Sequence, residues 1–100
     1  LSVTDTDRPV SGIVTFPSED YVVKTGDTGN LIYAIQLMLN SVHDVFNNVP
    51  DVDITGVYDT RTSQSIKTIQ QASRLPETGD VDKRTWDMLL GIYQTHRNFN

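Results

Sequence analysis

Hydrophobic residues recur at three- and four-residue spacings along the stretch NLIYAIQLMLNSV, from Asn30 to Val42. This is the period of an amphipathic helix that buries one face. The spacing predicts a helix over these residues, capped by Asp27 or Thr28. Its expected buried side consists of Leu31, Ile32, Ile35, Met38, Leu39 and Val42.

Two further helices are predicted, over about Thr60 to Ser73 and about Lys83 to Gln94. The earlier of these has a thin apolar side, made of Ile66 and Ile69 with help from Thr62 and Ala72. The later one has a fuller buried stripe, made of Trp86, Leu89, Leu90 and Tyr93. Three helices and no long strand pattern indicate an all-α fold, a compact three-helix bundle.

The remaining segments read as connections. Residues 1–20 are rich in Ser, Thr, Asp and Pro, which predicts an irregular arm or linker, although VSGIVTF is compatible with a short strand. YVVKTGDTG predicts a short extended piece followed by a turn. HDVFNNVPDVDI lacks a helical period, and we expect Phe46 and Val49 within it to turn inward. With 100 residues there is room for one domain, which we place at residues 21–100.

A short motif occurs twice. TGVYDTRT, which starts at Thr55, and TGDVDKRT, which starts at Thr78, share the pattern Thr-Gly-x-x-Asp-x-Arg-Thr, and each precedes a predicted helix. The glycine permits the positive φ of a tight turn, the apolar Tyr58 or Val81 is expected in the core, and the following aspartate caps the helix. The repeat therefore predicts two copies of one turn that starts a helix.

Composition narrows the possible functions. The net charge is -5, the pI is near 4.6 and there is no run of Lys or Arg, which argues against binding to nucleic acid or to anionic membrane surfaces. The absence of cysteine removes disulfides, thiolate metal sites and cysteine nucleophiles. The longest apolar stretch is too short to span a bilayer, and the beginning of the chain has no signal-peptide pattern. Because the first residue is Leu1, we expect a processed product or an excised module.

The order of these motifs resembles the peptidoglycan-binding domain type 1 family of bacterial cell-wall proteins. The resemblance covers about residues 22 to 90, in three blocks. In GDTGNLIYAIQLML it rests on Gly26, Gly29, Ile32, Ile35, Gln36 and Leu39. In TGVYDTRTSQSIKTIQ it rests on Gly56, Tyr58, Thr62, Ile66, Ile69 and Gln70. In RLPETGDVDKRTWDML it rests on Leu75, Gly79, Val81, Thr85, Trp86 and Leu89.

The resemblance implies a three-helix domain that binds cell-wall glycopeptide without catalysis and localises an attached, hydrolytic domain. It implies an extracellular or cell-wall location and no cofactor. The same scaffold can serve instead as a protein-interaction or assembly module, which is the alternative reading. The sequence departs from the family pattern at Asp59, Asp82 and Arg74, where the family usually has glycine, and at Thr55 and Thr78, where it usually has aspartate.

Other chemistries are less well supported. Asp51, Asp53 and Asp59 occupy positions of a calcium loop, but its twelfth position is Thr62 instead of a carboxylate, so turn and cap roles are favoured. His43 and His96 lack zinc-site spacing and are expected to be solvated. No residue spacing indicates catalysis, and the chain is not expected to be an enzyme.

Five residues are candidates for ligand contact in a shallow groove near the second predicted helix: Tyr58, Arg61, Thr62 and Gln70, with Gln36 behind them. For the two glutamines, hydrogen bonds to loop backbone are the favoured alternative. For Trp86, a core position is favoured over stacking on a sugar.

A second argument for ligand binding comes from charge. Arg61, Lys83 and Arg84 lie in first helical turns, where the helix dipole disfavours cations. They either attract ligand carboxylates or extend into water.

Overall fold

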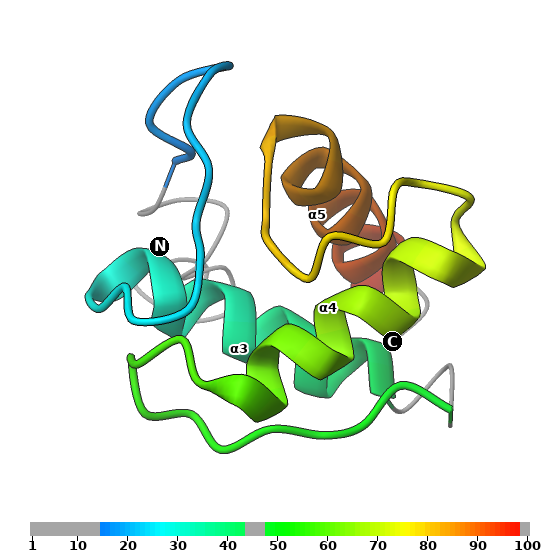
Figure 1. The fold of residues 1–100 in the computed structure, drawn as a ribbon. Helices are drawn as coiled ribbons and strands as arrows, with labels where there is room; N and C mark the ends of the chain where they lie inside the picture. The colour runs from blue at the N-terminus through cyan, green and yellow to red at the C-terminus, as the bar shows by residue number, and fades with distance from the viewer. Residues whose placement is uncertain (1–14, 44–47, 99–100) are drawn as a thin grey trace, which may run out of the picture.

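The computed structural model describes residues 15–43 and 48–98, with side chains up to Thr95. Within these ranges the chain forms three helices and no strand: α3 (Asn30–His43), α4 (Thr60–Ala72) and α5 (Lys83–Asn98) (Figure 1). The predicted all-α, three-helix fold is confirmed. The division into an arm at 1–20 and a domain at 21–100 stays a prediction.

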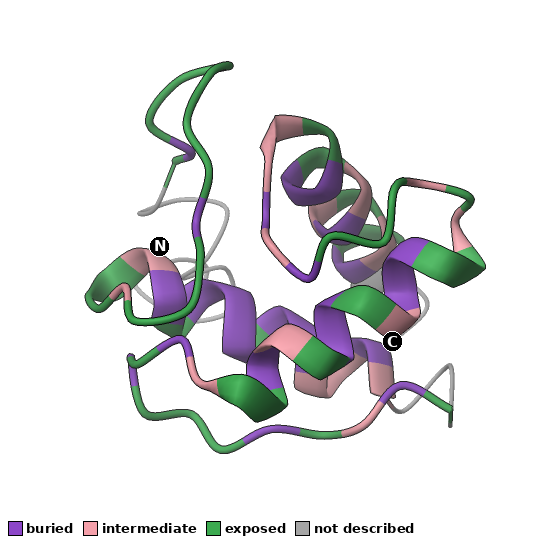
Figure 2. Ribbon diagram, in the orientation of Figure 1, coloured by how far each residue is buried: buried purple, intermediate pink, exposed green. Residues whose placement is uncertain are grey.

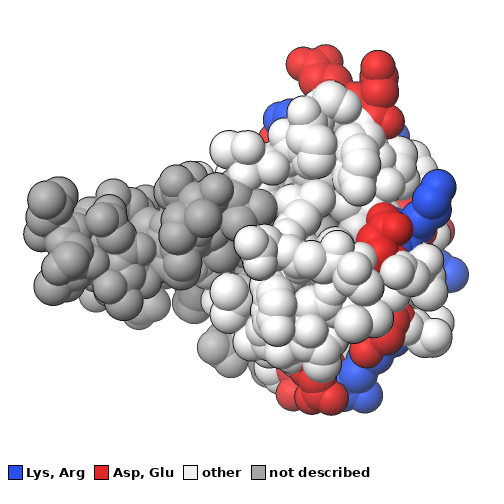
Figure 3. Space-filling view, turned by 90° about the vertical axis from the view of Figure 1, so that its left-hand side faces the viewer, with Lys and Arg blue, Asp and Glu red and all other residues white. Residues whose placement is uncertain are grey.

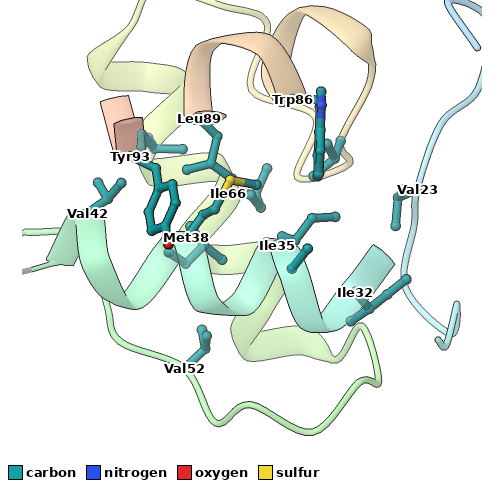
Figure 4. Packing of buried hydrophobic residues seen from close by; sticks show 14 of the residues in the cluster. Val23, Ile32, Ile35, Met38, Val42, Val52, Ile66, Trp86, Leu89 and Tyr93 are labelled. Atoms are coloured by element: carbon teal, nitrogen blue, oxygen red, sulfur yellow. The ribbon is translucent and has the colours of Figure 1, made fainter. Parts of the chain in front are cut away.

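The centre of the fold is α3, which packs more extensively against α5 than against α4. Buried residues follow one another along most of α3, whereas exposed residues recur along α4 (Figure 2). Ile35 and Met38 of α3 point toward α5, from which Leu89 and Tyr93 point back (Figure 4). The helical periodicity therefore predicted the core face of α3 correctly, because that face meets apolar side chains from both other helices.

Some side chains lie differently from the prediction. Ala72 is exposed because α4 ends there, and the buried side of α4 is completed by the polar side chains of Ser65 and Gln70. Leu31 and Leu90 are only partly buried at the margin of the core. Helical spacing finds the face of a helix, but the neighbouring elements decide how wide the buried stripe becomes.

The cap predicted for the first helix is wrong. The helix begins at Asn30, and the Gly29 carbonyl accepts hydrogen bonds from the N–H groups of Ile32 and Tyr33. The Asp27 carboxylate instead accepts a hydrogen bond from the Lys24 N–H, at 3.0 Å. An aspartate in a Gly-rich turn can bond either forward to a helix or back to its own turn, and the sequence does not distinguish the two.

The caps predicted for the other two helices are confirmed. Asp59 has extended backbone angles, and its Oδ1 accepts the Thr62 N–H at 2.9 Å. Asp82 does the same for the Thr85 N–H, also at 2.9 Å. Each carboxylate therefore satisfies one of the free N–H groups that open a helix.

A left-handed residue ends α4. Arg74 has a φ of 61°, its N–H donates to the Gln71 carbonyl, and the next N–H, of Leu75, donates to the Gln70 carbonyl. This pair of bonds is the Schellman motif, in which glycine is the usual left-handed residue. The motif explains why the sequence pattern favours glycine where this chain has Arg74.

The segment before α3 joins the core at two places. Val23 forms an isolated antiparallel bridge with Val81, through hydrogen bonds of 2.8 and 2.9 Å, as expected for an extended piece. Phe16 lies within the predicted arm, yet it is buried, with its ring centroid 5.5 Å from that of Trp86. Most of the strand considered at VSGIVTF lies outside the described residues.

The connection between α3 and α4 is held by side chains of α3. Asn40 makes two hydrogen bonds of 2.8 Å to the backbone of Val52, and a ring nitrogen of His43 lies 2.6 Å from the Val49 carbonyl. Val49 is buried as expected, and His43 is half-buried instead of solvated. Phe46 and the side chain of His96 lie outside the described residues.

Candidate functional site

The side chain of Gln36 holds the first copy of the repeated turn. Its Nε2 donates to the Val57 carbonyl at 2.9 Å and to the Thr62 hydroxyl at 3.2 Å. Its Oε1 accepts from the N–H groups of Thr55 and Gly56, both at 2.9 Å. The amide therefore uses its donors and its acceptor on the turn, as the hydrogen-bond alternative predicted.

Gln70 holds the second copy in the same way. Its Nε2 donates to the Asp80 carbonyl at 2.8 Å and to the Thr85 hydroxyl at 3.1 Å, while its Oε1 accepts from the Gly79 N–H at 3.0 Å. The two glutamines are thus equivalent residues, each at the core of one glutamine-turn unit. We call Gln36 with residues 55–62 the first unit, and Gln70 with residues 78–85 the second unit.

Both turns have a glycine with positive φ. Gly56 has a φ of 81° and Gly79 a φ of 78°, as the repeat predicted. A Cβ at either position would also lie 2.6 Å from a neighbouring side chain, the ring of Tyr33 or the hydroxyl of Ser63. Glycine is therefore required twice over, by the backbone angle and by close packing.

Tyr58 connects the two units. Its side chain has no exposed surface, and its hydroxyl donates to the Gly79 carbonyl at 2.7 Å. Burial raises the pKa of Tyr58 far above its ordinary value, and the carboxylates of Asp80 and Asp27 raise it further. The hydroxyl is consequently a permanent donor to the second turn.

Thr62 is also fully buried, at the first turn of α4. Its hydroxyl donates to Asp59 Oδ1 at 2.7 Å while accepting from Gln36. These hydrogen bonds from the hydroxyl and the N–H of Thr62 lower the pKa of Asp59. For Asp82, partial burial opposes ionisation, but hydrogen bonds from Thr85 and Arg84 outweigh it and lower the pKa.

The basic residues at the helix starts pair with aspartates of the chain. Arg61 donates from Nε to the Asp51 carbonyl at 2.7 Å and from Nη2 to its carboxylate at 3.0 Å. Lys83 pairs with Asp87, and Arg84 pairs with Asp82. These ion pairs offset the unfavourable positions of the cations in first helical turns.

The structure brings the five predicted contact residues together around the first unit and across to the second. Arg61 is exposed, with 60% of its side chain accessible, whereas the other four side chains are buried: Gln36, Tyr58, Thr62 and Gln70. Tyr58, Thr62 and Gln70 were predicted to line a shallow groove with Gln36 behind them, and in the structure the polar atoms of all four make hydrogen bonds within the two units. Among the described residues, no buried side-chain nitrogen or oxygen lacks a hydrogen-bond partner. Ligand binding near them stays a prediction.

Two of the three acidic residues of the calcium alternative have other partners. Asp51 pairs with Arg61, and Asp59 caps α4. Across the described ranges there is no group of three or more acidic or histidine side chains placed to hold a metal ion.

The sequence analysis did not single out the large apolar residues that are exposed in the structure, which are Tyr21 and Val22 before α3 and four residues of α3 and the connection after it. Tyr33 and Leu37 of α3, with Ile54 and Val57 of the following connection, are 44%, 37%, 42% and 45% exposed. The N–H groups of Thr55 and Gly56 bond to Gln36, so this connection lies along α3 beside Tyr33 and Leu37. An alignment of the two repeats that pairs Gln36 with Gln70 would have shown that these four positions are apolar in the first repeat and polar in the second.

Comparison with known proteins agrees with this geometry. Residues 28–89, well over half of the chain, match the family described as "Putative peptidoglycan binding domain". The chain therefore belongs to this family of binding domains. The matched range contains all of both glutamine-turn units.

A solved structure shares the fold. The SleB N-terminal domain, known from its crystal structure, is 22% identical in sequence, and the alignment has a TM-score of 0.63 and covers 76% of this chain and 96% of that domain. No curated protein matches this chain.

Proposed function

We propose that this chain is a non-catalytic module that binds peptidoglycan and thereby holds an attached, hydrolytic domain at the cell wall. The observation that carries the proposal is the match to the peptidoglycan-binding family over residues 28–89.

Arg61 is the predicted contact residue best placed to meet a ligand. Its ion pair with Asp51 is exposed on both sides, and exposed pairs of this kind contribute only about 0 to 1 kcal/mol. A carboxylate of a wall stem peptide can therefore replace Asp51 at little cost. In this proposal the buried side chains act indirectly: Gln36 and Thr62 fix the turn that precedes Arg61, and Gln70 and the Tyr58 hydroxyl fix the second turn.

The location proposed for the module is the cell wall or the extracellular space. No helix within the described residues has the length and apolar character needed to cross a bilayer. The presence of an attached domain is tested by reading the complete open reading frame, in which we expect a neighbouring hydrolase domain.

The binding proposal is tested by co-sedimentation with purified, insoluble peptidoglycan. We expect the chain to pellet with peptidoglycan and to stay in solution with cellulose, which controls for trapping by any insoluble polysaccharide. Arg61→Ala should weaken pelleting, while Lys67→Ala, on the same helix, should leave it unchanged. Recovery of the whole wild-type chain in the supernatant would reject the function.

A further inference from the structure

Because the two glutamine-turn units are equivalent, surface residues near the first unit can be compared with the residues at the same positions near the second unit. Tyr33 precedes Gln36 by three residues, as Lys67 precedes Gln70, and each lies beside the turn glycine of its unit. The same alignment pairs Leu37 with Gln71, Ile54 with Glu77 and Val57 with Asp80.

The counterparts differ in polarity at all four positions. In the second unit the residues are Lys67, Gln71, Glu77 and Asp80, which are exposed or half-buried and suit contact with water. In the first unit the same positions are Tyr33, Leu37, Ile54 and Val57, which we call the Tyr33 patch. The scaffold therefore accepts polar residues here, so folding does not require the exposed apolar side chains of the first unit.

The ring of Tyr33 is held in place. It lies against Gly56, where a Cβ would come within 2.6 Å of Cε2, and the Gly56 N–H is fixed by Gln36. Gly56 also bonds through its carbonyl to the Gly29 N–H, at 3.0 Å, at the start of the same helix. The protein thus presents a fixed, half-exposed aromatic ring with aliphatic side chains around it.

The four side chains of the patch are uncharged, and two acidic residues lie near its margin: Asp53 precedes Ile54 in the chain, and the Asp27 carbonyl accepts a hydrogen bond from the N–H of Tyr58, the residue after Val57. Figure 3 shows the side of the molecule on which α3 begins; the visible surface of the described residues is mostly uncharged at its centre, and charged atoms lie toward its top, right and bottom. For a chain with a net charge of -5, this neutral face is a local departure from the rest of the composition. It offers no charge complementarity to an ionic ligand, and it suits a neutral one.

We infer that the Tyr33 patch binds the neutral glycan part of peptidoglycan, with the C–H face of an N-acetylated sugar stacked on the Tyr33 ring. The electron-rich face of the ring attracts such C–H groups, and acetamido methyl groups contact the neighbouring aliphatic side chains. This inference rests on the proposed function and adds the component recognised and the residues that recognise it.

The size of the patch favours a saccharide over a protein partner. Four side chains exposed by 37% to 45% offer on the order of 300 Å². A stable protein interface buries roughly 800 Å² on each partner, more than twice that area. One or two sugar rings, by contrast, cover a patch of this size.

The test exchanges the patch for the residues of its own counterpart. The patch variant carries Tyr33→Lys, Leu37→Gln, Ile54→Glu and Val57→Asp. The control variant, Lys67→Ala with Glu77→Ala, changes two of the four equivalent positions of the second unit. Wild type and both variants are titrated with the β-1,4-linked tetramer of N-acetylglucosamine, which contains no peptide, while amide chemical shifts are followed.

We expect the tetramer to shift the amides of the wild type around Tyr33 and residues 54–57. The patch variant should lose about tenfold or more in affinity for the tetramer and should pellet less with whole peptidoglycan. The control variant should match the wild type in both assays. If the patch variant does not fold, the location of the shifts in the wild type decides the inference alone.

Three results would overturn the inference. If wild type pellets with peptidoglycan and the folded patch variant pellets equally, the function stands and the inference falls. If the tetramer shifts no amides of the patch, glycan binding there is excluded whether or not peptidoglycan binds. If sedimentation shows a dimer of the wild type that the patch variant does not form, the patch is an interface between copies.

Discussion

The two glutamine-turn units reach the same geometry from different lengths of chain. Gln36 bonds to Gly56 across 20 residues, whereas Gln70 bonds to Gly79 across 9. Three hydrogen bonds of each amide have the same kind of partner and nearly the same distance: to a turn carbonyl, to a threonine hydroxyl and from the turn glycine N–H. The units differ at the first threonine of the turn, whose N–H donates to Gln36 in the first unit and to the Pro76 carbonyl in the second. The position of each turn is therefore determined by the buried amide that binds it, and the length of the connection matters little.

The connections themselves are handled differently. Four residues after Gln36 the helix continues, and Asn40 holds the long connection by its two bonds to Val52. Four residues after Gln70 the helix has ended, and Arg74 makes the left-handed turn of a short connection. A long connection needs a side chain to hold it in place, whereas a short one needs only a sharp reversal.

The largest expected effect tests whether the two units are equivalent. Gln36→Leu and Gln70→Leu should each lower the free energy of unfolding by about 3 kcal/mol, because each leaves several buried turn groups without partners at about 1 to 3 kcal/mol apiece. Urea denaturation measures both losses, and Gln71→Leu, on the exposed side of α4, serves as the control with little change. A small loss for one glutamine and a large loss for the other would end the equivalence.

Smaller effects are expected at the two caps. Asp59→Ala and Asp82→Ala should each cost about 1 kcal/mol, since each carboxylate accepts hydrogen bonds from the N–H and the hydroxyl of the threonine three residues later. The measurement is again the unfolding free energy near pH 7. A loss at one aspartate several times larger than at the other would contradict the equivalence of the two caps.

The caps also predict a pH dependence. Folding lowers the pKa of both carboxyls, so their stabilisation is fully present above the unfolded pKa of about 3.9 and is lost as pH falls through the lowered folded value. Asp59→Asn keeps a capping side chain that does not titrate, so its stability should fall less between about pH 5 and pH 2 than that of the wild type. If the unfolding free energies of the wild type and of Asp59→Asn fall by the same amount over this pH range, the proposed link between the Asp59 pKa and stability is disproved.

The two units differ in the apolar residue before the capping aspartate, which is Tyr58 in the first unit and Val81, without a hydroxyl, in the second. Tyr58→Phe should lower the unfolding free energy by about 1 kcal/mol, because Ser63 also donates to the Gly79 carbonyl, at 3.0 Å, and keeps it partly satisfied. Thermal and urea unfolding check the value. A loss as large as that of the glutamine variants would show that the Tyr58 hydroxyl contributes as much to stability as Gln70 does.

The smallest effect concerns the end of the second unit's helix. Arg74→Gly should raise the unfolding free energy by about 0.5 kcal/mol, because glycine accepts the left-handed conformation without the penalty of a Cβ. Arg74→Ala, which keeps the Cβ, is the matched control and should show no gain. Stabilisation by both variants would assign the effect to the charge and not to the backbone.

Much of the fold was predictable because its signals are local. Helical spacing located all three helices, and the repeated motif located two turns and two caps, since glycine and aspartate act within a few residues of their own position. The failures arose where a local choice had two outcomes, as when Asp27 bonded back to its turn instead of forward to α3.

The candidate site was less predictable. The sequence analysis singled out Tyr58, Thr62 and the two glutamines as candidates for ligand contact. For the two glutamines it favoured a structural role, hydrogen bonds to loop backbone. The burial of these four side chains depends on contacts with residues outside their own helix or turn, such as that of Tyr58 with Gly79, 21 positions away, and that of Gln70 with Gly79, 9 positions away. Periodicity within one helix contains no information about such contacts.

The sequence by itself determined which segments of this protein are helical, where two of the helices begin, and which family it belongs to, because these features follow from short-range spacing. The tertiary structure decided which polar side chains are used to hold the turns and which apolar side chains remain exposed. Tyr33 and Lys67 have equivalent places in the two units, yet only the packed chain shows that the ring of Tyr33 stays half exposed. The physical reason is that exposure depends on what other parts of the chain cover, and that is determined only when the elements pack together.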